Sequence, residues 1–512
     1  MEIFMRKKIK EVEKSYKFIN KIIDSANSHL IKKLLLDNII IITTKHDLSP
    51  SNLFYNYLKR GVIDYKSKNV LKYKQNQNNP NKKYAKIIRL FQFGIKFILK
   101  PKKIWNITNI IDKKIILIYV PPGLRYLDLA LPIYEKIKNI SEFTPLLLYH
   151  WGEGKFCENN YKQINLFDYS IRVNQLCKIL KDLIMTKKAI NKEKKYKDFY
   201  NAIFKVIWKT QLINLIDEDI FRNLIKNTNK IKAIFFCSDP FTRVLSVIAK
   251  EFDIPTFSII GMLISYDLEF KFINTKFILA KGKQEKEIYI NLGFDEKKLK
   301  VVGTPFLKEK IINKGTMCGQ IKIFYVDQPF TQSFGIYCKR KIITLIGNKL
   351  KNLNNIKLLI KLHPASIDHE KIYEEEFHTI GFSNYQIYKS KYDLNKVLDI
   401  SDYAIIHNST VGFNVLFMNK PLIVLSNSFF EEDTGIDAEL LFFSERIAFT
   451  IRNEQDLQDI FTRISEGKLK RKNYKDIKTF LKYYIKYTGE TAAEHIVKFI
   501  ESKIRESEIK GT

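Results

Sequence analysis

Residues 113–138, KKIILIYVPPGLRYLDLALPIYEKIK, contain the unit from which the fold of this chain is predicted. Residues 113–120 read as a buried strand, because their apolar run is short and rich in β-branched residues, and the Pro-Gly turn at 121–123 opens a helix. A strand that passes through a short turn into a helix is the repeating unit of α/β proteins with a parallel sheet. This stretch therefore predicts the start of a doubly wound sheet.

The same alternation recurs in two series along the chain. The first series continues with TPLLLYH (144–150), KAIFFCSDP (232–240), PTFSII (255–260), TKFILAKG (275–282) and LKVVGTP (299–305). The second series contains IKIFYVDQP (321–329), IKLLIKLHP (356–364), NYQIYKS (384–390), SDYAIIHNST (401–410), KPLIVLS (420–426) and IAFTI (447–451). Two such series predict two Rossmann-like, doubly wound α/β domains that face each other across a cleft.

The predicted domain boundaries follow from these series, since 512 residues are too many for one compact core. We expect a basic, partly helical appendage, an N-terminal Rossmann-like domain, a linker, a C-terminal Rossmann-like domain and a helical segment that packs back across the domains. These parts are predicted at 1–110, 111–305, 306–320, 321–473 and 474–512.

The chain carries a formal net charge of +32, from 87 lysines and arginines against 55 acids. Such an excess suits a partner with phosphate or carboxylate groups, such as nucleic acid or an anionic membrane surface. The abundance of Lys, Asn and Ile throughout also fits a bias of an AT-rich genome. The total charge therefore leaves both explanations open, and local clusters are better evidence.

One cluster lies in the segment NKKYAKIIRLFQFGIKFILKP at 81–101. Its basic residues fall on one narrow stripe at helical spacing, while Ile, Leu and Phe cover the rest. A helix of this kind suits an anionic membrane interface, and it would equally suit packing on the neighbouring domain with its lysines in water. The predicted membrane contacts are Lys82, Lys86, Arg89, Lys96 and Lys100.

The compartment is predicted from cysteine usage and from the N-terminus. The five cysteines are widely spaced, with no CxxC pair and no His/Cys cluster of metal-ligand spacing. The first residues carry a charge every few positions, and no apolar run is long enough to span a bilayer. We expect a cytoplasmic protein without structural zinc, peripheral on the inner face of the cell membrane if the basic helix binds lipid.

Polar residues gather where two strands of the second series end. His363 and Pro364 follow the run IKLLIKL, and His407, Asn408, Ser409 and Thr410 follow DYAII at the start of a helix. Ligands of open parallel sheets bind beyond the carboxyl ends of the strands. We expect these two strands to be neighbours, so that a cap at Ser409 or Thr410 and the imidazole of His363 form a phosphate-binding site. Taken alone, a Ser-Thr pair before a helix is more often only a helix cap, and a His-Pro pair is more often only a strand end with a turn.

This pair of motifs resembles the C-terminal donor domain of bacterial GT-B glycosyltransferases of surface polysaccharide synthesis. The resemblance includes the sialyltransferase and polysialyltransferase-like families with His-Pro and Ser/Thr motifs, and glycerophosphotransferases of teichoic acid synthesis carry a similar pair. It implies that His363, Ser409 and Thr410 hold the donor phosphate. The segments 232–260 and 277–305 are similar to the N-terminal acceptor domain of the same group. The expected donor-binding residues are His363, Pro364, His407, Asn408, Ser409, Thr410, Gly303, Asp327 and Gln328.

Two positions depart from the resemblance. Many relatives have His-Gly after the strand that ends here in Ile260 and Gly261, and the helix after the Ser/Thr turn often carries a glutamate where Asn414 stands nearest.

Asp327 and Gln328 end the first strand of the second series, so their loop is expected to contact donor or acceptor.

The predicted catalytic residues are Asp239, His363 and Asp128. His363 would protonate the leaving phosphate, and Asp239 would take the proton of the acceptor hydroxyl, with Asp128 and His150 as other candidate bases. Asp239 also fits an N-cap, because proline follows it. No DxD pair sits where a metal-dependent transferase needs one, so we expect no metal and no cofactor, with the nucleotide-sugar as substrate.

The resulting prediction is a glycosyltransferase that moves a sugar from a nucleotide-activated donor to a surface glycan or lipid-linked acceptor of capsule or lipopolysaccharide type. The alternatives are a CMP-sialic acid-dependent sialyltransferase or polysialyltransferase, a glycerophosphotransferase on the same fold, and a nucleotide-sugar 2-epimerase. A non-catalytic nucleic-acid-binding protein is the alternative from another class, and we expect no nucleic acid because the basic residues belong to no recognisable recognition module.

Overall fold

The computed structural model describes most of the chain from residue 113 onward. The described residues are 10, 13, 16–17, 20, 23–24, 26, 29, 31–36, 113–121, 124–140, 142–149, 161–165, 173–193, 215, 218–226, 228, 230–237, 243–261, 270–271, 273–307, 319–328, 333–363, 366, 369–390, 392–407, 409–426 and 445–511. The predicted basic helix with Lys82, Lys86, Arg89, Lys96 and Lys100 lies outside the described residues, so its membrane contact stays a prediction.

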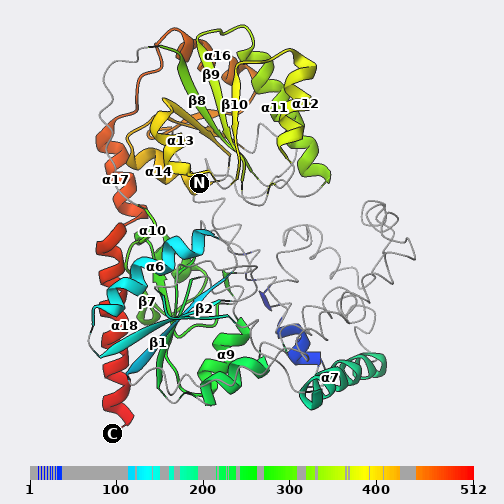
Figure 1. The fold of residues 1–512 in the computed structure, drawn as a ribbon, viewed down its shortest axis with the longest axis vertical. Coiled ribbons are helices and arrows are strands. Elements are labelled where there is room, and N and C mark those ends of the chain that lie inside the picture. The colour runs from blue at the N-terminus through cyan, green and yellow to red at the C-terminus, as the bar shows by residue number, and fades with distance from the viewer. Residues whose placement is uncertain are drawn as a thin grey trace. The chain divides into compact units, whose positions relative to one another are not determined.

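The chain divides into two compact units, each built on its own parallel sheet (Figure 1). The first unit contains residues 1–306 and 490–512, and the second contains residues 307–489. The two doubly wound Rossmann-like sheets predicted from the sequence are confirmed. The cleft between the units stays a prediction.

The first unit contains a parallel sheet with the strand order β3-β2-β1-β4-β5-β6-β7. One of its inner strands, β1, is hydrophobic on both faces, as expected for a strand covered by helices on each side. Ile116 and Ile118 face one core, and Ile115 and Leu117 face the other. The strands are β1 (Lys114–Val120), β2 (Phe143–Tyr149), β3 (Gln163–Asn165), β4 (Ile231–Phe236), β5 (Thr256–Ser258), β6 (Phe277–Ala280) and β7 (Leu299–Val301).

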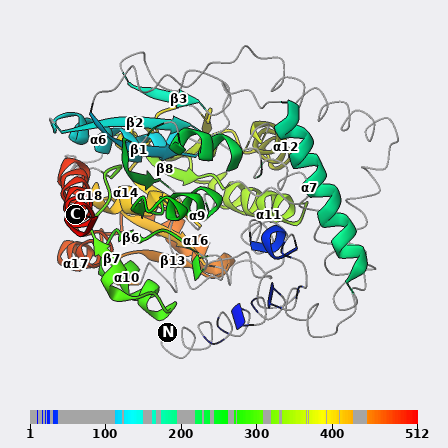
Figure 2. The same cartoon turned by 90° about the horizontal axis from the view of Figure 1, so that it is seen from below.

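Helices cover both faces of this sheet (Figures 1 and 2). They include α6 (Leu124–Lys138), α7 (Val173–Lys192), α9 (Arg243–Glu251), α10 (Lys283–Asn291) and the C-terminal α18 (Gly489–Gly511). Helix α18 supplies Ile496, Ile500 and Ile504 to the same core as α6 and the alternate residues of β1. The last helix of the chain therefore completes the core of the first unit.

The second unit contains a parallel sheet with the strand order β10-β9-β8-β11-β12-β13. From its first strand, β8, the chain builds outward through β9 and β10 on one side and through β11, β12 and β13 on the other, so the direction reverses between β8 and β11. In open α/β sheets this reversal marks the crevice where ligands bind. The strands are β8 (Ile321–Val326), β9 (Ile356–Lys361), β10 (Tyr385–Tyr388), β11 (Tyr403–Ile406), β12 (Leu422–Leu425) and β13 (Phe449–Ile451).

The helices of the second unit are α11 (Ser333–Leu350), α12 (Glu370–Ile380), α13 (Leu394–Ile400), α14 (Val411–Phe417), α16 (Glu454–Ser465) and α17 (Tyr474–Tyr484). Helices α11 and α12 pack side by side (Figure 1). The two helices approach closely at Gly347 of α11, because a Cβ atom there would force the side chain of Ile380 on α12 to shift.

Candidate functional site

Three segments with predicted donor-binding residues leave the second sheet at its carboxyl edge. Asp327 follows β8, His363 follows β9, and residues 407–410 follow β11. The expectation that β9 and β11 are neighbours is wrong, because β8 lies between them. The reason is that the sheet grows from β8 in both directions, so the two strands pair with opposite edges of it. Asp327 thus leaves the sheet between the two predicted halves of the phosphate site.

Asp327 is buried, with 1% of its surface exposed, and its carboxylate is fully engaged. Its Oδ2 atom accepts a hydrogen bond of 2.9 Å from the backbone N–H of His363. Its Oδ1 atom accepts one of 2.6 Å from the hydroxyl of Tyr373 and lies 2.5 Å from Nζ of Lys339. The side chain therefore binds the turn after β9, and its predicted contact with donor or acceptor stays a prediction, as does that of Gln328.

Lys339 extends these contacts to the far end of the same turn. Its side chain has no exposed surface, and its Nζ lies 2.7 Å from Nδ1 of His369 and 3.2 Å from the backbone oxygen of Gln328. An ammonium group has donors only, so a charged Lys339 requires Nδ1 of His369 to be the acceptor. Burial lowers the pKa of Lys339, and the charge of Asp327 opposes that shift.

The turn from His363 to His369 also closes on itself. The backbone N–H of Ser366 donates to the carbonyl oxygen of His363 at 2.8 Å, and that of His369 donates to the carbonyl oxygen of Ser366 at 3.3 Å. The hydroxyls of Ser366 and Tyr325 are buried and have no hydrogen-bond partner among the described residues. Burial raises the pKa values of Tyr325 and Tyr373, so both phenols stay protonated.

The segment after β11 forms the other side of the candidate site. His407 is buried, with 3% of its surface exposed, and Ser409 and Thr410 are half-buried. The hydroxyl of Ser409 accepts a hydrogen bond of 3.2 Å from the backbone N–H of Val411, whereas Thr410, which occupies the N-cap position of α14, makes no side-chain cap. Ser409 is thus the residue that caps this short helix.

Other predicted site residues lie in the first unit or outside the described residues. Asp128 is exposed on α6, and Gly303 is buried after β7 with a φ of +82°, which favours glycine. Pro364, Asn408, Asp239 and His150 lie outside the described residues. Their assigned roles, like those of Asp128 and Gly303, stay predictions.

Ile260, one of the two positions that depart from the resemblance, is held through its backbone by a buried lysine of the first unit. The backbone oxygen of Ile260, where relatives have histidine, accepts a hydrogen bond of 2.7 Å from Nζ of Lys281. Lys281 is buried and also lies 2.7 Å from Oε1 of Glu285 on α10. A buried ion pair therefore fixes the end of the chain segment that follows β5.

The sequence reasoning missed Lys339, Tyr373 and His369. A signal for Lys339 exists in the sequence, because it falls at helical spacing with Ile342, Ile343 and Ile346, which are buried on α11. A lysine in such an apolar stripe needs a buried partner. The partner could not be read from the sequence, since it comes from the end of another strand.

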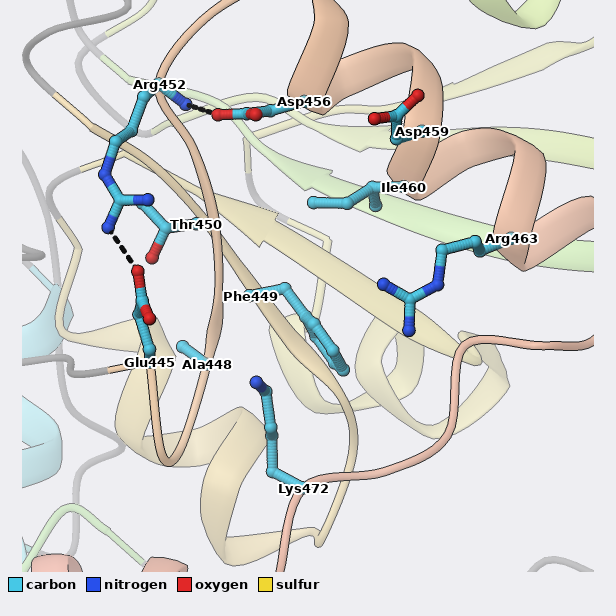
Figure 3. A pocket seen from close by; sticks show the side chains of 10 residues that line it. All are labelled: Glu445, Ala448, Phe449, Thr450, Arg452, Asp456, Asp459, Ile460, Arg463 and Lys472. Carbon is cyan, nitrogen blue, oxygen red and sulfur yellow. Dashed lines mark hydrogen bonds and ion pairs between the residues drawn. The ribbon is translucent and has the colours of Figure 1, made fainter.

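A separate pocket of about 260 Å³ lies along β13 and α16 (Figure 3). Its lining includes an ion pair of 2.6 Å between Arg452 and Glu445, and Lys472 lies over the ring of Phe449. It contains none of the predicted site residues. Its lining residues are Glu445, Ala448, Phe449, Thr450, Arg452, Asp456, Asp459, Ile460, Arg463 and Lys472.

No described helix is long and apolar enough to cross a membrane. Within the same residues, no group of three or more His, Cys, Asp or Glu side chains is arranged to hold a metal ion. The expected independence from metal stays a prediction.

Comparison with known proteins points to the second unit. The family described as CDP-glycerol:poly(glycerophosphate) glycerophosphotransferase matches residues 335–502, which is less than half of the chain and runs from α11 into α18. The matched segment includes His363 and residues 407–410. None of the curated proteins matches the chain.

Several solved structures are similar at low identity. Anabaena Alr3699/HepE in complex with UDP and glucose is 10% identical with a TM-score of 0.49, over 76% of this chain and 100% of that one. UDP-GlcNAc 2-epimerase from Neisseria meningitidis bound to UDP-GlcNAc is 12% identical with a TM-score of 0.48, over 76% and 100%. Acinetobacter baumannii MurG is 12% identical with a TM-score of 0.44, over 76% and 99%. The assignment of the fold rests on the two parallel sheets themselves.

Proposed function

We propose that this protein is a transferase that holds the phosphates of a nucleotide-activated donor in its second unit and transfers the activated group to a hydroxyl acceptor. The observation that carries the proposal is the position of His363 and Ser409 at the carboxyl ends of β9 and β11, on either side of β8 and beside the reversal of the sheet. The family match over the same segment supports it.

The site has the chemistry that a phosphate requires. His363 is half-buried, and its backbone N–H donates to Oδ2 of Asp327, which fixes the place of the residue at the end of β9. An imidazole next to a phosphate can donate a hydrogen bond to it and protonate it as it leaves. The half-buried hydroxyls of Ser409 and Thr410 supply further donors from the end of β11.

The family match favours CDP-glycerol as the donor over a nucleotide-sugar. In that reaction the acceptor hydroxyl oxygen bonds to the phosphorus that carries glycerol, and the bond from this phosphorus to the bridging oxygen breaks. CMP leaves with the bridging oxygen, where His363 places a proton, and the proton of the hydroxyl goes to a base. Asp239, Asp128 and His150 remain the proposed bases.

Transfer of a sugar is the second candidate function, because the motif pair around His363 and Ser409 also resembles that of glycosyltransferases with nucleotide-sugar donors. There the bond between the sugar and the donor phosphate breaks, so a UDP-sugar releases UDP and CMP-sialic acid releases CMP. A surface glycan or a lipid-linked glycan is the proposed acceptor in either case, and a peripheral position at the inner membrane belongs to the same proposal.

The released nucleotide distinguishes these reactions. Purified protein is incubated with a lipid-linked glycan as acceptor and, in separate reactions, with CDP-glycerol, CMP-sialic acid, UDP-sugars or GDP-sugars, and the nucleotides are separated by chromatography. We expect CMP from CDP-glycerol in the wild type, a strong loss in His363→Gln and a smaller loss in Ser409→Ala. Release of UDP or GDP from one nucleotide-sugar would favour sugar transfer. Epimerisation would instead convert one nucleotide-sugar into another, with no net release of nucleotide. If no nucleotide is turned over and none raises the melting temperature at millimolar concentration, the transferase proposal fails.

A further inference from the structure

We propose that the buried pair Asp327 and Lys339 are positioning residues that set the place of the His363 imidazole by holding both ends of the turn that carries it. The proposal deepens the proposed function, because it depends on His363 as the phosphate-binding group. The turn runs from the end of β9 to the start of α12.

The two ends of the turn meet the same ion pair. At its start, the backbone N–H of His363 donates to Oδ2 of Asp327 at 2.9 Å. At its end, Nδ1 of His369 lies 2.7 Å from Nζ of Lys339. Asp327 and Lys339 are themselves 2.5 Å apart, so one pair of charges connects both ends. A shift of Lys339 would reach His369 directly and His363 through Asp327.

The surroundings leave this pair little freedom. Tyr373, which is buried on α12, donates its hydroxyl to Oδ1 of Asp327 at 2.6 Å, and Nζ of Lys339 lies 5.2 Å from the centre of its ring. Asp327 comes from the strand between β9 and β11, and Lys339 comes from α11. Sheet, α11 and α12 are therefore joined at the base of the His363 turn.

A purely structural role explains the charges poorly. Replacement of a buried ion pair by apolar side chains of similar volume is often neutral or stabilising, so packing alone does not favour this pair. Hydrogen bonds directed at the backbone of His363 and at the ring of His369 are what apolar side chains cannot supply. Catalytic groups need such supports, because a displacement of about 1 Å can reduce turnover by about 100-fold.

The first test compares two neighbouring residues of α11. Lys339→Met removes the contact to His369, whereas Arg340→Met removes ion pairs to Glu375 and Glu376 of α12 without touching the turn. With CDP-glycerol we expect kcat to fall about 100-fold in Lys339→Met, with KM changed less than about 3-fold, and both to stay near wild type in Arg340→Met. Equal effects of the two substitutions would overturn the proposal.

A second pair of variants guards against loss of the fold in Lys339→Met. His369→Gln keeps an acceptor for Nζ of Lys339, and His369→Leu removes it. We expect His369→Leu to lose turnover and His369→Gln to recover most of it, at similar melting temperatures. The same turnover in both variants would contradict a positioning role of the contact between Lys339 and His369.

A third measurement does not require turnover. Side-chain NMR of protein labelled with ¹⁵N-histidine, assigned with His363→Gln and His369→Gln, reports both imidazoles directly. We expect Lys339→Met to shift the signals of His363 and His369 and to leave that of His495 in α18 unchanged. If the wild type turns over no donor, the proposed function fails while these signals still decide the positioning role. An unshifted His363 signal in Lys339→Met would refute it.

Discussion

The ammonium of Lys339 lies 2.5 Å from Oδ1 of Asp327 at a place where neither side chain has any exposed surface. The carboxylate comes from the end of β8, and the ammonium comes from α11. Because the same two groups reach His363 and His369, the pair joins the core of the second unit to its candidate phosphate site. The proposed positioning role therefore couples the stability of the second unit to its activity. The substitutions below measure the two effects separately.

The first prediction concerns the candidate phosphate site itself. His363→Gln removes the group proposed to protonate the leaving phosphate, and we expect kcat to fall by about 10²- to 10⁴-fold. Ser409→Ala removes one hydroxyl donor and the cap of α14, and we expect a smaller loss. Steady-state kinetics with CDP-glycerol measures both. Asn395→Ala, at an exposed position of α13, is the control and should retain wild-type kinetics.

The second prediction concerns the cost of an unpaired buried charge. Lys339→Met leaves Asp327 buried without its cation, and we expect the free energy of unfolding to fall by about 3–5 kcal/mol. Asp327→Asn combined with Lys339→Met removes both charges, so the double variant should recover much of that loss. Denaturant unfolding of the full chain, followed by a signal from the second unit, measures the difference. A double variant as unstable as the single one would argue against an unpaired charge as the cause.

The third prediction is a pH dependence with a definite sign. Burial lowers the pKa of Lys339 from its ordinary value of 10.5, so the unfolded chain binds more protons at this residue than the folded one between the two pKa values. The contribution of Lys339 to the free energy of unfolding should therefore rise with pH in the window below 10.5 and be lost as pH falls. Subtraction of the Lys339→Met curve from the wild-type curve isolates this contribution. A difference that falls as pH rises would contradict the shift.

The fourth prediction concerns the C-terminal helix. Ile496 of α18 has no exposed surface and packs in the core of the first unit, so Ile496→Ala should reduce the free energy of unfolding by about 2–5 kcal/mol. Ile509 lies on the same helix with 74% of its surface exposed, and Ile509→Ala should change it by less than about 0.5 kcal/mol. Thermal or denaturant unfolding compares the two. Similar losses would mean that α18 does not pack as described.

The fifth prediction concerns metal. We expect transfer from CDP-glycerol to continue after dialysis against EDTA, because the proposed site manages the charge of the leaving phosphate with His363 and hydroxyl groups. The measurement is turnover before and after dialysis, with and without added Mg²⁺. Complete loss that Mg²⁺ restores would place a metal in the reaction.

The fold could be predicted because each buried strand is visible as a short apolar run that ends in a turn. The run at 113–120 became β1, and the run at 356–361 became β9. The order of the strands could not be predicted from these runs, because it is decided by which edges pair in the folded sheet. For that reason β9 and β11 were expected as neighbours, although β8 lies between them.

The candidate site was predictable only in part, for a similar reason. His363 and Ser409 stand at strand ends, and a strand end can be recognised from a local pattern. The support of His363 by Asp327 and Lys339 depends on contacts between residues that are far apart in the chain. An inward-facing lysine in the apolar stripe of α11 signals that such a contact exists, but it does not name the partner.

The return of α18 to the first unit makes the second unit an insertion within the first. During synthesis, residues 307–489 are therefore complete while the first unit still lacks Ile496, Ile500 and Ile504 of its core. Domains usually fold in the order in which the ribosome releases them. Here the core of the first unit is complete only after the second unit has been synthesised, so a nascent chain that stops before α18 leaves an apolar surface of the first unit uncovered.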